Sequence, residues 1–160
     1  MSEYTSPVPM AGPDTIAPEP YTEIYPMPMF VSIPTADFDA SKDFWMRGLG
    51  FIDLFSIPDQ VTHLRRWAFQ DVLLVPGERT EQAPISVSFA CVMSEIEPIA
   101  ARCEELAPGS VAGPAETPWN TVDITATTPE GARVVMTAAQ PLDRNGEKAA
   151  AMREMGLDFV

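Results

Sequence analysis

The sequence is poor in the residues from which metal and redox centres are usually built. It contains one histidine, His63, and two cysteines, Cys91 and Cys103. The two cysteines form neither a Cys-x-x-Cys pair nor a Cys/His spacing typical of zinc. Because catalytic zinc, iron and nickel sites normally draw on imidazole, this composition excludes a histidine-rich metal site. We expect both thiols to be reduced and buried in the core.

Positive charge and long apolar runs are also scarce. Ten basic residues stand against 23 acidic ones, which gives a formal net charge of −13. An acidic surface repels phosphate backbones and anionic headgroups, so we expect neither a nucleic-acid nor a membrane partner. No stretch reaches the roughly 18 to 20 apolar residues of a membrane span, and the first residues lack the order of a signal peptide. We therefore expect a cytoplasmic protein.

Motifs that activate a nucleophile or bind a nucleotide are absent as well. The chain has no Gly-x-Ser-x-Gly, no phosphate-binding glycine loop and no dinucleotide fingerprint. Spacing assigns neither a nucleophile nor a carboxylate partner to His63, so we interpret it as a strand or pocket residue rather than a catalyst. The sequence favours a binding protein over an enzyme.

What the chain does have is proline at its start. Residues 1–28 contain seven prolines and neither lysine nor arginine, which is typical of an extended arm. Its apolar side chains from Tyr21 to Met29 are too dense for a free linker. We predict that this segment packs against the rest of the chain or a partner subunit.

Two similar segments follow the arm. The first, 29–75, predicts a strand at 29–34, a helix at 38–49 capped by Asp37 or Asp39, and three further strands. These strands are expected at 51–57, 62–69 and 72–75, with a tight turn at Gln70-Asp71 between the last two.

After a polar linker, residues 85–138 repeat the same order, so that 29–140 forms one paired domain. A strand at 85–91 precedes a capping box, Ser94-x-x-Glu97, and a helix ending near Leu106. Strands are predicted at 110–112, 122–127 and 133–138, and the tail 141–160 contains a short helix at 146–155. The predicted fold class is α+β, with two βαβββ modules.

The order of these motifs resembles the glyoxalase/bleomycin-resistance/dioxygenase, or vicinal-oxygen-chelate, superfamily. Three segments carry the resemblance: the first helix, Asp37 to Phe51; the stretch Glu116 to Asn120; and the hairpin Pro129 to Arg133. The resemblance is strongest to the drug-binding, bleomycin-resistance branch. It implies a cupped mixed sheet and a homodimer.

Metal enzymes of that superfamily take ligands from the first strand of each module and from a last strand. The resemblance places these positions at Phe30, at Ser86 or Ser88, and at Val135. Phenyl and isopropyl groups have no lone pair and serine hydroxyls are weak donors, so we expect neither a metal nor another cofactor.

Strand alternation defines the predicted ligand site. His63, Arg65, Trp67 and Phe69 share one side of the third strand, where aromatic rings suit flat ligands. Trp45 is assigned to the core, whereas Trp67 and Trp119 fit either the pocket or a core or dimer contact. The predicted ligand-binding residues are Phe30, Ser32, His63, Trp67, Phe69, Ser88, Trp119 and Val135.

The predicted function is metal-independent sequestration of an aromatic or cationic natural product, as in antibiotic resistance or self-protection. The first alternative is a lyase, isomerase or dioxygenase of the same superfamily with an atypical or absent metal site. A second alternative is a partner-binding module in which the proline-rich arm carries the recognition.

Overall fold

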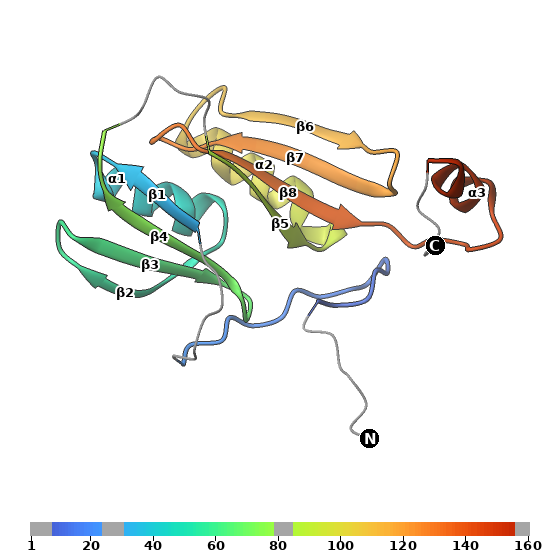
Figure 1. Cartoon of the computed structure of the whole chain (residues 1–160), viewed down its shortest axis with the longest axis horizontal. Helices are drawn as coiled ribbons and strands as arrows, with labels where there is room; N and C mark the ends of the chain where they lie inside the picture. Colours follow the sequence, from blue (N-terminus) through green and yellow to red (C-terminus); the bar gives the residue numbers. More distant parts are fainter. Residues whose placement is uncertain (1–7, 24–30, 79–84, 156–160) are drawn as a thin grey trace.

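The computed structural model describes residues 8–23, 31–78 and 85–155. Within these ranges the chain forms two four-stranded mixed sheets, each with helices on one face (Figure 1). The two sheets are built in the same chain order, strand, helix and three strands, which confirms the predicted α+β fold of two βαβββ modules. Among the described helices, none combines the length and the apolar character that a membrane crossing requires.

The first sheet has the strand order β1-β4-β3-β2. Strand β1 runs parallel to β4, and the other neighbours are antiparallel. Its helix α1 continues directly into η1, one turn of π-helix. Of the two predicted caps, Asp37 and Asp39, the side chain of Asp37 is the one that caps α1. The bounds are β1 Val31–Thr35, α1 Phe38–Asp43, η1 Phe44–Gly48, β2 Ile52–Ile57, β3 Val61–Arg66 and β4 Gln70–Pro76.

The second sheet repeats this arrangement in the order β5-β8-β7-β6, with β5 parallel to β8. A short 3-10 turn, η2, leads into helix α2, and the tail carries the predicted short helix, α3. The bounds are β5 Ser86–Cys91, η2 Met93–Glu95, α2 Ile96–Leu106, β6 Val111–Glu116, β7 Thr121–Thr127, β8 Arg133–Ala139 and α3 Glu147–Glu154.

One hydrophobic core runs through both halves of the fold, between the sheets and the helices. Trp45 is fully buried there, as predicted, and packs edge-on against Phe51 at 4.9 Å. Phe51 in turn meets Phe89 of the second sheet at 5.2 Å. These T-shaped contacts join the two modules through aromatic side chains.

Both cysteines lie in this core, as expected. Burial raises the pKa of the Cys91 thiol to about 12 and that of the Cys103 thiol to about 11. A thiol with a raised pKa carries little thiolate at neutral pH and reacts slowly. The two side chains therefore act as hydrophobic core residues.

The hairpin between β7 and β8 is tied to the first module by Glu130. One carboxylate oxygen of Glu130 accepts a hydrogen bond from Trp45 Nε1 and the other accepts one from Ser41 Oγ, both at 2.7 Å. The polar atoms of two buried residues are thereby satisfied across the module boundary. Glu130, in the predicted turn Pro129-Glu130-Gly131, therefore forms hydrogen bonds with two residues that are distant in sequence.

Two local predictions are wrong. The turn between β3 and β4 lies at residues 67–69, with Trp67 at φ 57°, and Gln70 and Asp71 belong to β4. The register is set by polar pairs across the hairpin, Arg65 with Asp71 and Arg66 with Gln70, which turn propensity does not reveal.

The predicted capping box is also wrong. The carboxylate of Glu95, not that of Glu97, accepts the backbone N–H of Val92, while the Ser94 hydroxyl donates to the carbonyl of Thr15 in the arm. Helix α2 nevertheless ends at Leu106, as expected. The local cap thus lies two residues earlier than predicted, at Val92 and Glu95, and Ser94 makes a tertiary contact instead.

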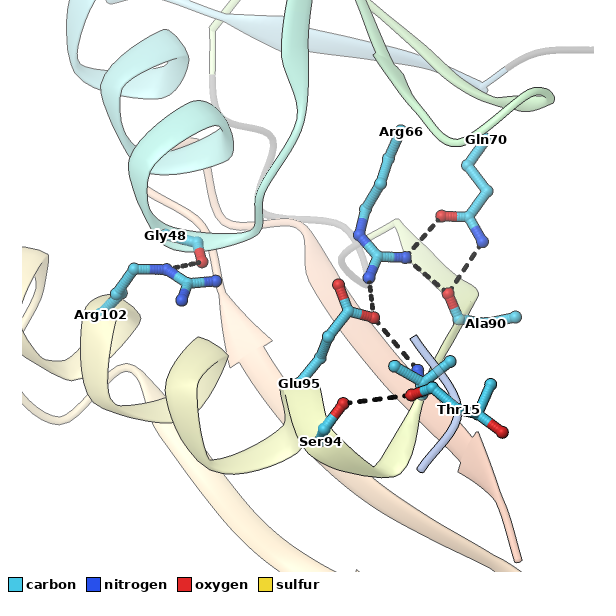
Figure 2. Close-up of polar contacts among 9 residues, drawn as sticks. Thr15, Gly48, Arg66, Gln70, Ala90, Ser94, Glu95 and Arg102 are labelled. Atoms are coloured by element: carbon cyan, nitrogen blue, oxygen red, sulfur yellow. Dashed lines mark hydrogen bonds and ion pairs between the residues drawn. The ribbon is translucent and has the colours of Figure 1, made fainter. Parts of the chain in front are cut away.

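Arg66 is the main polar link between the two modules (Figure 2). Its guanidinium donates to Gln70 Oε1 at 2.9 Å and to the Ala90 carbonyl at 2.7 Å, and it pairs with Glu95. It also lies over the Trp67 ring at 4.7 Å. Because the side chain is almost fully buried, these partners are the ones that replace water.

We predict that Arg66→Met lowers the free energy of unfolding by about 3 kcal/mol, because Glu95 and the Ala90 carbonyl lose a buried charged partner. Arg102→Met is the matched control. Arg102 also joins the modules, by donating to the Arg47 and Gly48 carbonyls, but it lies on the surface. Its loss should cost less than about 1 kcal/mol. Urea unfolding measures both, and equal losses would contradict the assigned role of Arg66.

Candidate functional site

The face of the second sheet that points away from the core forms an open cavity of about 440 Å³. Strand alternation produces this face, because Phe89, Val134 and Met136 turn inward and their neighbours turn outward. The lining residues come from all four strands and from the loop between β6 and β7. They are Ser88, Ala112, Gly113, Ala115, Trp119, Asp123, Thr125, Arg133 and Val135.

A row of paired residues crosses the floor of this cavity. Ser88 on β5 pairs with Val135 on β8, which in turn pairs with Thr125 on β7. At the far edge, β6 bulges at Gly113, where an added Cβ would lie 2.8 Å from the Asp123 carbonyl oxygen. A glycine is therefore needed where β6 closes one side of the cavity.

Asp123 is the one carboxylate among the lining residues. Its Oδ1 accepts hydrogen bonds from Thr121 Oγ1 and Thr137 Oγ1, both at 2.7 Å. Within the described residues it forms no ion pair, and no hydrogen bond reaches its other oxygen, Oδ2. Two hydroxyl groups thus fix the orientation of a half-buried negative charge beside the cavity.

Arg133 and Trp119 lie at the rim. Arg133 donates to Ser86 Oγ at 3.1 Å and to Thr125 Oγ1 at 3.4 Å, and its side chain stays exposed. Trp119 is 55% exposed although it lines the cavity. Its loop is held by Asn120, whose side-chain amide donates to the Gln140 carbonyl at 2.8 Å. The aromatic face is therefore presented to solvent on an anchored loop.

The second sheet does not fit a bound metal ion. Val135 stands directly beside Ser88, and of the two only the serine hydroxyl has a lone pair to offer. Over residues 8–23, 31–78 and 85–155, no three His, Cys, Asp or Glu side chains are grouped so as to hold a metal. The chemistry available in the cavity is hydrogen bonding, charge and aromatic contact.

The structure brings three of the predicted ligand-binding residues together, Ser88, Trp119 and Val135. Trp67 lies elsewhere. It is 2% exposed and borders a smaller cavity of about 140 Å³ between the arm and the second sheet. Phe30 falls outside the described residues.

The remaining predicted residues belong to the first sheet. Ser32 is exposed on β1, and Phe69 is 43% exposed in the turn after β3. Strand β3 ends at Arg66, so His63 and Arg65 share a face but Trp67 and Phe69 do not continue it. The four aromatic and basic residues expected on one strand face are therefore divided.

His63 is buried and has a carboxylate partner that spacing did not reveal. Its Nε2 lies 2.7 Å from Asp71 Oδ1, across the β3–β4 hairpin. The same oxygen accepts a hydrogen bond from Arg65 Nε at 2.8 Å. All three side chains are more than nine-tenths buried, so they form an internal network rather than part of the open cavity.

Sequence reasoning missed Asp123, Thr125 and Arg133 as lining residues. The signal was present, because alternation along 133–138 puts Arg133 on the same face as Val135, and alternation along 122–127 puts Asp123 with Thr125. Applying the alternation rule to every strand of the repeat would have identified them.

No family model and no curated protein matches the sequence. Solved structures do match. An integron cassette protein from the mobile metagenome of the Halifax Harbour sewage outfall is 25% identical, with a TM-score of 0.57 over 72% of this chain and 99% of that chain.

Two further structures are less similar in sequence. Lactoylglutathione lyase from Agrobacterium tumefaciens is 17% identical, with a TM-score of 0.56 over 75% of this chain and 96% of that chain. A bleomycin-binding protein solved with bleomycin is 16% identical, with a TM-score of 0.55 over 70% of this chain and 98% of that chain. The chain therefore has the vicinal-oxygen-chelate fold, which it shares with these lyases and drug-binding proteins.

Proposed function

We propose that the chain binds a small aromatic or cationic natural product in the cavity of the second sheet, without a metal and without a chemical step. The observation that carries this proposal is the pairing of Trp119 with Asp123 in one open cavity. The bleomycin-binding protein of the same fold supports a sequestering role. The acidic charge of the chain argues against nucleic acid as the ligand. We also propose a cytoplasmic location.

Trp119 supplies the aromatic contact. An indole ring that is more than half exposed inside a cavity has a free face for a flat ligand. Stacked aromatic pairs contribute about 0.5 to 1.5 kcal/mol beyond the area that they bury. Since the loop is anchored through Asn120, it should lose little conformational entropy when a ligand binds.

We predict that Trp119→Ala weakens binding of an aromatic antibiotic at least about tenfold, because both stacking and buried area are lost. Phe69→Ala is the control, since Phe69 is an exposed aromatic residue in the turn between β3 and β4, outside this cavity. Titration calorimetry with the best ligand from a panel of aromatic antibiotics and cationic glycopeptides measures the change. An equal effect of both substitutions would indicate that the ligand binds at another face of the molecule.

Chelation separates this proposal from a metal-dependent lyase, isomerase or dioxygenase. Because Ser88 and Val135 do not form a metal site, the same titration in excess chelator should give an unchanged affinity. Loss of binding on chelation would contradict a metal-independent site.

Asp123 supplies the charge. Its Oδ1 is held by two threonine hydroxyls, which leaves Oδ2 as an acceptor for a ligand ammonium or amidinium group. A hydrogen bond to a charged group contributes about 1.5 to 3 kcal/mol, roughly twice that of a neutral pair.

We predict that Asp123→Asn weakens a cationic ligand by about tenfold or more and leaves a neutral analogue of the same ring system nearly unchanged. The substitution keeps the size of the side chain and an oxygen that can accept from the two threonines. Paired titrations of the charged and neutral ligands measure the difference. Equal weakening of both ligands would show that Asp123 supports the fold of the cavity rather than ligand charge.

We also propose that the protein is a homodimer. Phe55 and Ile57, on edge strand β2, are 43% and 44% exposed, and an unpaired edge with apolar side chains favours association. Sedimentation at micromolar concentration should give about twice the monomer mass of 17.5 kDa. A mass of one chain at that concentration would rule the dimer out.

A further inference from the structure

The N-terminal arm contacts both modules at one end of the molecule. In Figure 1 its described residues, 8–23, run along the end of the molecule where the β3–β4 hairpin and the end of β5 lie. Residues 8–12 and Thr15 border the smaller cavity beside Ala90 and Thr137 of the second sheet. The Thr15 carbonyl accepts a hydrogen bond from Ser94 at 3.4 Å. This half of the arm is held against the second module.

The other half of the arm is held by Arg65 of the first sheet. Arg65 Nη1 donates to the Tyr21 carbonyl at 3.1 Å and to the Glu23 carbonyl at 2.7 Å. Its Nε donates to Asp71 Oδ1 at 2.8 Å, so the guanidinium joins the arm to a buried carboxylate. The side chain of Arg65 has no exposed surface in this arrangement.

A third contact completes the attachment. The backbone N–H of Tyr21 donates to the carbonyl of Trp67 at 2.9 Å. The two carbonyls that bind Arg65 are two residues apart, which is the spacing at which groups of an extended chain point to the same side. The Tyr21 side chain itself is 41% exposed, and its hydroxyl donates to Glu23. Arg65 also lies over the Tyr21 ring, at 6.0 Å from its centroid, so the hydrogen bonds of the first sheet go to the main chain of the arm and one aromatic side chain adds to them.

We propose that the hairpin end of the first sheet, at Arg65 and Trp67, is a docking site for an extended peptide, and that the arm, Val8–Glu23, is its resident occupant. Arg65 binds two main-chain carbonyls, so the site recognises the extended conformation of the peptide. This is the logic of strand-like peptide recognition, in which main-chain hydrogen bonds supply the affinity. The bound arm covers Arg65 at this end of the first sheet.

Covalent attachment favours the chain's own arm over other peptides. A tethered segment acts at an effective concentration on the order of millimolar, so a free peptide of equal intrinsic affinity competes poorly. A buried charged donor also strengthens the contact, because water does not compete for it. The docking site should accept a free peptide only when the attachment of the resident arm is weakened.

Hydrogen exchange in the full-length protein tests the clamp. The amide of residue 21 should be protected in the wild type, because it donates to the Trp67 carbonyl. Arg65→Lys keeps a charge beside Asp71 but lacks the planar fork that reaches two carbonyls, so protection should fall roughly tenfold. Tyr21→Ala is the control, and it should keep its protection because its main-chain groups are intact. Unchanged protection in Arg65→Lys would overturn the proposal.

A second experiment leaves Arg65 and the strands of the first sheet unaltered. Tyr21→Pro removes the N–H that binds Trp67. In a Trp119→Phe background the remaining indoles are Trp45 and Trp67, both at most 2% exposed. Release of the arm should raise acrylamide quenching of tryptophan fluorescence toward the value of one exposed indole. Quenching equal to that of the Trp119→Phe parent would contradict the assigned contact.

Addition of a synthetic peptide in trans then tests the docking site itself. A peptide of residues 8–23 with the natural sequence should return the quenching of the Tyr21→Pro variant to the parent value at millimolar concentration. The same peptide methylated on the nitrogen of residue 21 should bind several-fold more weakly, because the donor is blocked. Equal effects of both peptides, or no effect of either, would show that the face does not read the main chain.

Discussion

Each sheet of this fold has two faces, and the helices cover only one of them. Alternation along the strands places one set of side chains in the shared core and the other set on the outward face. The outward side chains contact either another segment or solvent. At the hairpin end of the first sheet the N-terminal arm supplies part of this cover, bound through Arg65. In the second sheet most of the corresponding face stays open as a cavity of about 440 Å³. The division of roles between the modules follows from this difference in cover.

Strand β3 connects the arm with the second module. Neighbouring residues on a strand point to opposite faces, so β3 can bind a different partner on each side of the sheet. Arg65 turns to the open face, where it binds Asp71 and the arm. Arg66 turns to the core face, where it pairs with Glu95 and the Ala90 carbonyl of the second module. Both guanidinium groups are buried, and both are satisfied by partners from other segments. Two adjacent arginines therefore connect the arm, the first sheet and the second module.

The two halves of the repeat also treat their acidic residues differently. Asp71 stands across the hairpin from Arg65, and the guanidinium compensates its charge. Asp123 stands across the second hairpin from Thr137, and hydroxyl groups orient it without neutralising it. Among the described residues Asp123 forms no ion pair. The first acid therefore serves the internal network, and the second keeps a charge that suits a cationic ligand.

The sequence by itself determined the features that depend on local periodicity: the βαβββ repeat, the buried Trp45 and the core thiols. It left Asp37 and Asp39 as alternative helix caps, and the structure uses Asp37. Alternation and helical spacing are encoded in neighbouring residues, so they can be read without coordinates. Only the tertiary structure decided the turn at 67–69, the partner of His63 and the place of the arm. Arg65 contacts arm residues 42 and 44 positions away, and Arg66 contacts Glu95 29 positions away. Buried polar groups take whichever partner the packed fold brings within reach, and no local pattern records that choice.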